Sequence, residues 1–263
     1  MNPDDLVAPC LTDPRDRILL SQAPILPMPQ FGELAHPPLG RRQYVAASDG
    51  LYVRARHHGL SVTARLSKVA LPFGPLETAI HLPGGLVPFE LYDAMERAAI
   101  AACPVEWAGV VHWDELHERY GLVIPRVISH SHGDITYATD EIDFERVVLI
   151  VHSHGLLPPF FSPTDDASDS AGVYFASVLG ECRDSRTIHA RTRLVIEGHR
   201  TPDLRPPWVT RAEHALAKTI DEASLIDPLF WRPSAHETHL PLTRSLADAA
   251  DQDPTLGRWR YRG

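Results

Sequence analysis

The chain has 263 residues, of which 44% are hydrophobic, and its formal net charge at pH 7 is −9. A chain of this size buries a full core as one large or two small domains, and its acidic balance makes nucleic acid an unlikely partner. Three cysteines without a Cys-x-x-Cys pair are typical of a reduced, intracellular protein. No segment approaches the ~20 apolar residues that span a bilayer, and the acidic start is unlike a signal peptide, so we expect a cytoplasmic protein without a membrane partner.

The sequence pattern in the first part of the chain predicts a small β-rich region. Its proline-rich start shows no sustained hydrophobic period and is expected to be loop. Strands are predicted over 44–47 and 51–55. They form a β-hairpin around Asp49-Gly50, because Asp-Gly supplies the positive φ angles of a tight turn. A third strand is expected over 61–66, and the whole region over 1–86.

A helix followed by strands is predicted next. Residues 89–102 carry apolar side chains at helical spacing, which indicates a helix with one face in the core. Pro104 ends this helix, and a strand follows over 107–113. Glu106 lies at the junction of helix and strand. A further strand is expected over 122–128.

The run 146–151 is short, apolar and β-branched, which predicts a buried strand. His152 and His154 follow it, separated by one residue. At the two-residue period of a strand, both imidazoles leave the same face, so their ring nitrogens can converge on one ion. Ser153, between them, is expected to point away from that ion.

Ser162-Pro163 is typical of a helix N-cap followed by proline at the first helical position. Asp165 then lies in the first helical turn. Two imidazoles and one carboxylate leave the fourth tetrahedral position of a zinc ion open, which is the layout of a catalytic site. Asp166, beside the third ligand, is expected to be a solvated acid favoured by the helix dipole.

The remaining elements complete an alternation of helices and strands. The apolar run 171–179 is expected to continue the helix that carries Asp165, and one or two strands are expected within 186–197. A capping box that starts at Thr210 opens a helix to about residue 223, and another helix is expected around 243–250. This order predicts an α/β core.

A second His-Ser-His-Gly tetrapeptide starts at His130. Asp143 even follows it at the spacing of the first motif, but Asp140 stands where that motif has serine, and no unbroken buried strand precedes it. We interpret His130 and His132 as polar turn residues at the rim of the site, where they contact substrate. A second metal site there is the alternative.

The pattern His-x-His, seven residues, Ser, two residues, Asp resembles the signature of the JAMM (JAB1/MPN) zinc metalloproteases. Here it is filled by His152, His154, Ser162 and Asp165. The resemblance implies a JAMM/MPN-type, cytidine-deaminase-like α-β-α sandwich over 87–205, followed by a helical, proline-rich extension over 206–263. One departure is Gly155, where many members have proline.

The resemblance also implies a mechanism. In this family an upstream glutamate lies at the end of the first helix and the start of the first strand, and Glu106 corresponds to it. Zinc-bound water is expected to attack the carbonyl with Glu106 as general base, while Ser162 donates a hydrogen bond to the developing oxyanion. Glu90, Glu115 and Glu118 remain alternatives for the base.

Substrate and partners follow from the resemblance alone. JAMM enzymes typically cut peptide or isopeptide bonds after the C-terminal tail of ubiquitin or ubiquitin-like proteins, with the tail paired as an added strand. A β-rich region before a JAMM core resembles the bacterial PRTRC system, which implies a ubiquitin-like substrate and E1/ThiF-like and E2-like partners. The alternatives are tail-processing peptidases of sulfur-carrier or antiviral operons, and a metal-free JAMM-like scaffold that binds partner proteins.

Overall fold

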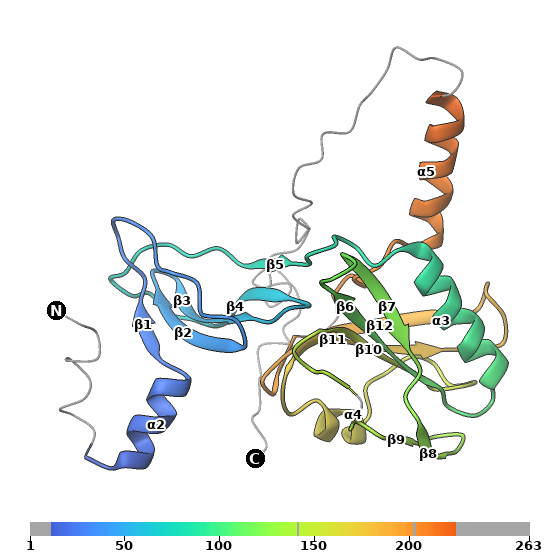
Figure 1. The fold of residues 1–263 in the computed structure, drawn as a ribbon, viewed down its shortest axis with the longest axis horizontal. Coiled ribbons are helices and arrows are strands. Elements are labelled where there is room, and N and C mark those ends of the chain that lie inside the picture. The colour runs from blue at the N-terminus through green and yellow to red at the C-terminus, as the bar shows by residue number, and fades with distance from the viewer. Residues whose placement is uncertain (1–11, 141, 202–203, 225–263) are drawn as a thin grey trace. The chain divides into compact units, whose positions relative to one another are not determined.

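The computed structural model describes residues 12–140, 142–201 and 204–224 (Figure 1). The helix predicted around 243–250 lies outside these residues. None of the described helices is long and apolar enough to cross a membrane.

The chain divides into two compact units. Within the described part, the first unit contains residues up to 57 together with 61–81, and the second contains 58–60 and everything from 82 onward. The segment 58–60 is therefore flanked in sequence by the first unit but packs in the second. Its backbone explains this, because the N–H groups of His58 and Gly59 both donate to the carbonyl oxygen of Glu145, at 2.8 and 3.3 Å.

The first unit is a five-stranded sheet in the order β1-β2-β3-β4-β5. Its strands are β1 (Ile25–Pro27), β2 (Arg41–Ala47), β3 (Gly50–Arg56), β4 (Ser61–Lys68) and β5 (Ala79–His81). The predicted hairpin and third strand are confirmed as β2, β3 and β4. Helix α2 (Pro14–Gln22) and β1 lie where only loop was predicted. Proline at the start of this helix is compatible with helix, because the first helical N–H needs no partner.

The glycine of the predicted Asp-Gly turn is needed for another reason than the one expected. Gly50 is not among the glycines with positive φ in this part of the chain. A Cβ added to it would lie 2.1 Å from the carbonyl oxygen of Ser67 on β4. Close approach of the neighbouring strand, and not the turn conformation, requires glycine here.

The second unit is built on a six-stranded sheet in the order β13-β12-β11-β10-β6-β7. The strands are β6 (Ala108–Asp114), β7 (Arg119–Val123), β10 (Val147–Ser153), β11 (Val173–Gly180), β12 (His189–Ile196) and β13 (His199–Thr201). A separate two-stranded hairpin is formed by β8 (Val127–His130) and β9 (Ile135–Tyr137). The helices are α3 (Phe89–Ala102), α4 (Pro163–Ser168) and α5 (Arg211–Ser224). Figure 1 shows α3 alongside the sheet and α4 close to the β8–β9 hairpin.

Most elements of this unit agree with the sequence prediction. Helix α3 has the predicted bounds. Met95 and Ala99, on its apolar face, are fully buried in the core. The capping box is present in α5, since Thr210 and Glu213 exchange side-chain to backbone hydrogen bonds of 2.9 and 3.3 Å. The strand predicted over 122–128 is two strands, because the chain leaves the sheet after β7. Among the described residues, β8 pairs with β9 alone. The fold is mixed α/β, as predicted.

The helix predicted through 171–179 is wrong. α4 ends at Ser168, and the run from Val173 forms β11, in which every residue is buried. Valine, tyrosine and phenylalanine suit a strand, and a strand covered on both faces loses the alternation that distinguishes it from a buried helix. β11 lies between β10 and β12 and pairs with β10 in parallel, so that His152 stands opposite Val178.

Candidate metal centre

The two histidines of the predicted pair lie at the end of β10, which the sheet encloses between β6 and β11. The Nε2 atoms of His152 and His154 are 3.2 Å apart, and the ring of Phe160 packs edge-on against that of His154 at 4.5 Å. Ser153, between them, is fully buried, and its Oγ accepts a hydrogen bond of 2.9 Å from the Trp107 N–H. The hydrogen bond from Trp107 thus ties the residue between the two imidazoles to the residue before β6.

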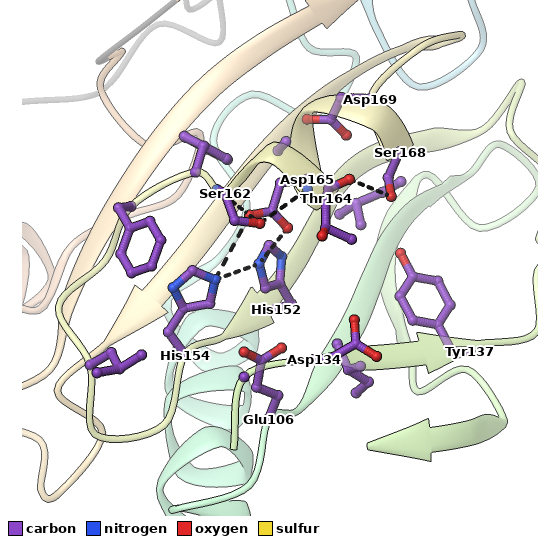
Figure 2. A pocket seen from close by; sticks show the side chains of 17 residues that line it. Glu106, Asp134, Tyr137, His152, His154, Ser162, Thr164, Asp165, Ser168 and Asp169 are labelled. Carbon is purple, nitrogen blue, oxygen red and sulfur yellow. Dashed lines mark hydrogen bonds and ion pairs between the residues drawn. The ribbon is translucent and has the colours of Figure 1, made fainter. Parts of the chain in front are cut away.

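Asp165 is positioned by a capping box at the start of α4. The hydroxyl of Ser162 accepts a hydrogen bond from the Asp165 N–H, at 3.2 Å. In return, Asp165 Oδ2 accepts from the Ser162 N–H at 2.6 Å and from its hydroxyl at 2.7 Å. This leaves Asp165 Oδ1 to face His152 Nε2 at 3.1 Å (Figure 2).

Both shifted pKa values in this group favour the forms that bind metal. Burial alone would raise the pKa of Asp165, but the hydrogen bonds and charge of His152, followed by the hydrogen bonds from Ser162, hold it well below its usual range. Burial lowers the pKa of His154, and the neighbouring His152 lowers it further. An ionised carboxylate and a neutral imidazole are the states in which these side chains act as ligands.

The group fits a zinc ion. Two nitrogens at 2.0–2.1 Å from a tetrahedral zinc lie about 3.3 Å from each other, close to the separation between the two Nε2 atoms. Ligand atoms from His152, His154 and Asp165 all lie within 4.8 Å of one another. In the described part of the chain, no comparable group includes His130 or His132. The predicted ligands are therefore brought together, and the repeated tetrapeptide has no such arrangement.

Glu106 lies between α3 and β6, and it is only 5% exposed. Its own N–H donates to the Ser131 carbonyl at 2.9 Å, while the next N–H, of Trp107, binds Ser153. Burial raises the pKa of Glu106 to about 7; His152 opposes this rise, and Asp165 and Asp134 add to it. Figure 2 shows its carboxylate directed toward the two imidazoles, on the side away from Asp165.

These residues share a cavity of about 120 Å³. Its other walls are formed by residues of the β8–β9 hairpin, the sheet, the loop before α4, and α4 itself: Gly133, Asp134, Ile135, Tyr137, Ile150, Leu157, Phe160, Phe161, Ser162, Thr164, Ser168, Asp169 and Ala176. Glu106 is the one glutamate among the lining residues, so none of the alternative bases reaches the cavity. Glu115, for example, pairs with His58.

The residues of the β8–β9 turn that lie at the cavity are not the ones predicted. His130 and His132 are exposed and do not line the cavity, and their contact with substrate stays a prediction. Ser131, between them, binds the backbone of Glu106, and Asp134 of the same turn faces the cavity. The Gly-Asp turn at the end of the repeated tetrapeptide was the sequence signal that could have pointed to Asp134.

The predicted oxyanion role of Ser162 is not visible in this arrangement. Its single hydroxyl proton is directed at Asp165 Oδ2, so here Ser162 orients a ligand. Donation to an oxyanion requires this proton to turn away from Asp165, and that role also stays a prediction.

Two family models and a solved structure match parts of this chain. Residues 88–194 match the family described as prokaryotic homologs of the JAB domain, and residues 13–83 match a domain of unknown function, DUF2016. A solved structure described as "JAMM: A Metalloprotease-like Zinc Site in the Proteasome and Signalosome" aligns over 48% of this chain and 98% of its own, with 13% identity and a TM-score of 0.31. No curated protein sequence matches.

The segment that carries the candidate site is therefore similar in sequence to the prokaryotic JAB domain, and its own fold is mixed α/β. In this chain it follows the segment that matches DUF2016, and the two matches meet close to the boundary between the two compact units.

Proposed function

We propose that the chain is a zinc-dependent hydrolase of peptide or isopeptide bonds. The observation that carries this proposal is the convergence of His152, His154 and Asp165 in one cavity with Glu106, a buried carboxylate whose pKa is raised to about 7. The JAB-like domain supports the same class of hydrolase.

Zinc held by the three ligands supplies Lewis acidity, which polarises a carbonyl group and acidifies a water molecule. Glu106 takes one proton from the water while the water oxygen forms a bond to the carbonyl carbon. Glu106 then returns the proton to the leaving amine nitrogen as the C–N bond breaks. A pKa near the working pH suits a group that must both accept and donate a proton.

The proposed substrate is the C-terminal tail of a ubiquitin-like protein. A tail can pair as an added strand where a sheet edge is open, and the β8–β9 hairpin pairs with no third strand among the described residues. This hairpin borders the cavity through Ile135 and Tyr137, and β8 exposes Val127 and Ile128. These features support a tail laid along the hairpin with its scissile bond at the metal centre.

The finer proposal is a role in a bacterial PRTRC-type system, with E1/ThiF-like and E2-like proteins as further partners. It is supported by the arrangement of a β-rich domain before a JAB-like domain, which resembles that system.

The test is zinc content and cleavage of a ubiquitin-like protein fused through its tail to a reporter. We expect one zinc per chain and cleavage that a chelator abolishes. Glu106→Gln should abolish cleavage while zinc stays bound, because Glu106 moves a proton and is not among the ligands. His152→Asn should lose the zinc itself.

The repeated tetrapeptide provides a matched control for the metal. His132→Asn changes the same residue type in the same His-Ser-His-Gly sequence, and zinc content should be unchanged. A wild-type preparation without zinc, whose cleavage of the fusion is unaffected by chelator, would contradict the proposal and favour a scaffold that only binds partners.

A further inference from the structure

Helix α4, which carries Asp165, has few of the supports that usually hold a helix. It is six residues long and has no buried residue, whereas isolated helices shorter than about 12–15 residues are marginal in water. The capping box of Ser162 and Asp165 secures its first turn. The rest of the helix must be held from outside.

Arg193 of β12 forms contacts that stabilise the C-terminal end of α4. It is 5% exposed, and its Nε and Nη2 lie 2.8 and 2.7 Å from Asp169 Oδ2, while Nη1 donates to Asp166 Oδ1 at 2.5 Å. Asp169 caps the helix, since its N–H donates to the Asp165 carbonyl at 2.9 Å. Its other oxygen accepts from the Tyr174 hydroxyl at 2.9 Å. The backbone of the third ligand is thus tied to β11 and β12.

The same guanidinium also contacts the chain before the helix. Its Cζ lies 3.8 Å from the ring centroid of Phe161, the residue preceding Ser162. Arg193 therefore touches both sides of the segment from Ser162 to Asp165. Only the planar guanidinium group of arginine can stack on a ring and bind two carboxylates at once, because a lysine ammonium is a single point charge.

Arg200 of β13 also contacts α4, through Asp166. It donates to the Asp166 carbonyl at 2.5 Å and lies 3.7 Å from the Asp166 carboxylate, but it is more exposed. In the described part of the chain Arg200 contacts Asp166 but neither Asp169 nor Phe161, so it does not bracket the ligand segment.

We propose that Arg193 is a positioning residue for the metal centre, which sets the place of Asp165 and Ser162 relative to the two histidines by clamping α4 to the sheet. The inference rests on the proposed function in one respect, that this centre binds zinc. Partners that orient metal ligands typically change metal affinity about 10–100-fold when removed.

The first test is zinc affinity, measured by competition with a chromophoric chelator. Arg193→Met should weaken zinc binding about 10–100-fold. Arg193→Lys should restore little of it, since the charge returns without the fork. The matched control is Arg119→Met on β7 of the same sheet, whose side chain is 71% exposed and 3.9 Å from its partner Asp114. Its zinc affinity should equal that of the wild type.

The second test needs no metal. In the metal-free protein, hydrogen exchange of the peptide spanning 162–169 should become faster in Arg193→Met, while exchange in β10 stays at the wild-type rate. If Arg193→Met does not fold, Asp169→Asn replaces it, because that change weakens the clamp and keeps the stacking on Phe161. The same loss of zinc affinity and local protection is expected.

The outcomes separate this inference from the proposed function. If wild type binds zinc and cleaves, but folded Arg193→Met or Asp169→Asn binds zinc equally well, the positioning role is overturned and the proposed function stands. Faster exchange across the whole sheet, without a change specific to α4, would also overturn it in favour of a general role in folding. A wild-type chain that binds no zinc overturns both.

Discussion

The buried carboxylate of Glu106 makes the stability of the metal-free protein depend on pH. Burial raises its pKa from an ordinary 4.5 to about 7, so between these values the folded chain binds a proton that the unfolded chain releases. The stabilising contribution of the protonated form is complete below pH 4.5 and is lost as pH rises through 7. The burial that would suit Glu106 to the proposed proton transfer therefore weakens the fold at alkaline pH.

Replacing Glu106 by glutamine should remove this dependence, because an amide does not ionise. The free energy of unfolding of metal-free Glu106→Gln, relative to wild type, should rise by up to about 3 kcal/mol between pH 4.5 and 8, at 1.36 kcal/mol per pKa unit. Urea unfolding at a series of pH values measures it. The exposed Glu90→Gln serves as control. A difference between variant and wild type that is the same at all pH values would show that Glu106 is not perturbed.

At the scale of elements, the connection between β10 and α4 depends on Gly155, which follows the second histidine. Its φ is +55°, in the left-handed region, and an added Cβ would lie 2.3 Å from the Pro104 carbonyl oxygen. Proline, which the resembled family often has at this point, is fixed near φ −65° and cannot adopt this conformation. The left-handed backbone at Gly155 thus excludes proline here, and it passes close to the segment that carries Glu106.

Gly155→Ala should destabilise the fold by more than about 1 kcal/mol, the usual cost of a left-handed conformation for alanine, because contact with the Pro104 backbone adds to it. Denaturant unfolding of the metal-free protein measures the loss. Gly133→Ala is the matched control, since Gly133 has ordinary φ and nothing within 4 Å of the added Cβ. Equal stability of the two variants would contradict the conformation assigned to Gly155.

At the scale of the whole molecule, the two compact units are not two uninterrupted segments of chain. Leu60 lies between β3 and β4 in sequence, yet it belongs to the second unit and is fully buried. The second unit is therefore interrupted in sequence, since residues 58–60 belong to it while the strands on either side of them belong to the first unit.

Leu60→Ala should accordingly lower the stability of the second unit, by about 2–5 kcal/mol for a buried leucine. Hydrogen exchange followed by mass spectrometry locates the effect, and protection should fall in β10 and β6. The exposed Leu116→Ala, at 84% exposure, is the control and should change little. Loss of protection confined to β2 and β3 would assign Leu60 to the first unit instead.

The candidate metal ligands could be predicted because the position of each depends on local geometry. His152 and His154 need only the two-residue period of a strand, and the Ser-Pro N-cap at Ser162 is enough to place Asp165 in the first helical turn. No long-range information enters either rule. Glu106 required more, because it precedes His152 by 46 residues, and only resemblance to a known family joined the two.

By itself, then, the sequence determined the candidate ligands and helix α3, which follow from periodicity and caps. It also placed the hairpin of β2 and β3, although the reason for its glycine came only from the structure. The tertiary structure alone decided that the run after α4 is a central strand, since burial on both faces erases the pattern that separates strand from helix. It also paired Asp166, expected to be a solvated acid, with Arg193, because contacts between residues far apart in sequence leave no local signal.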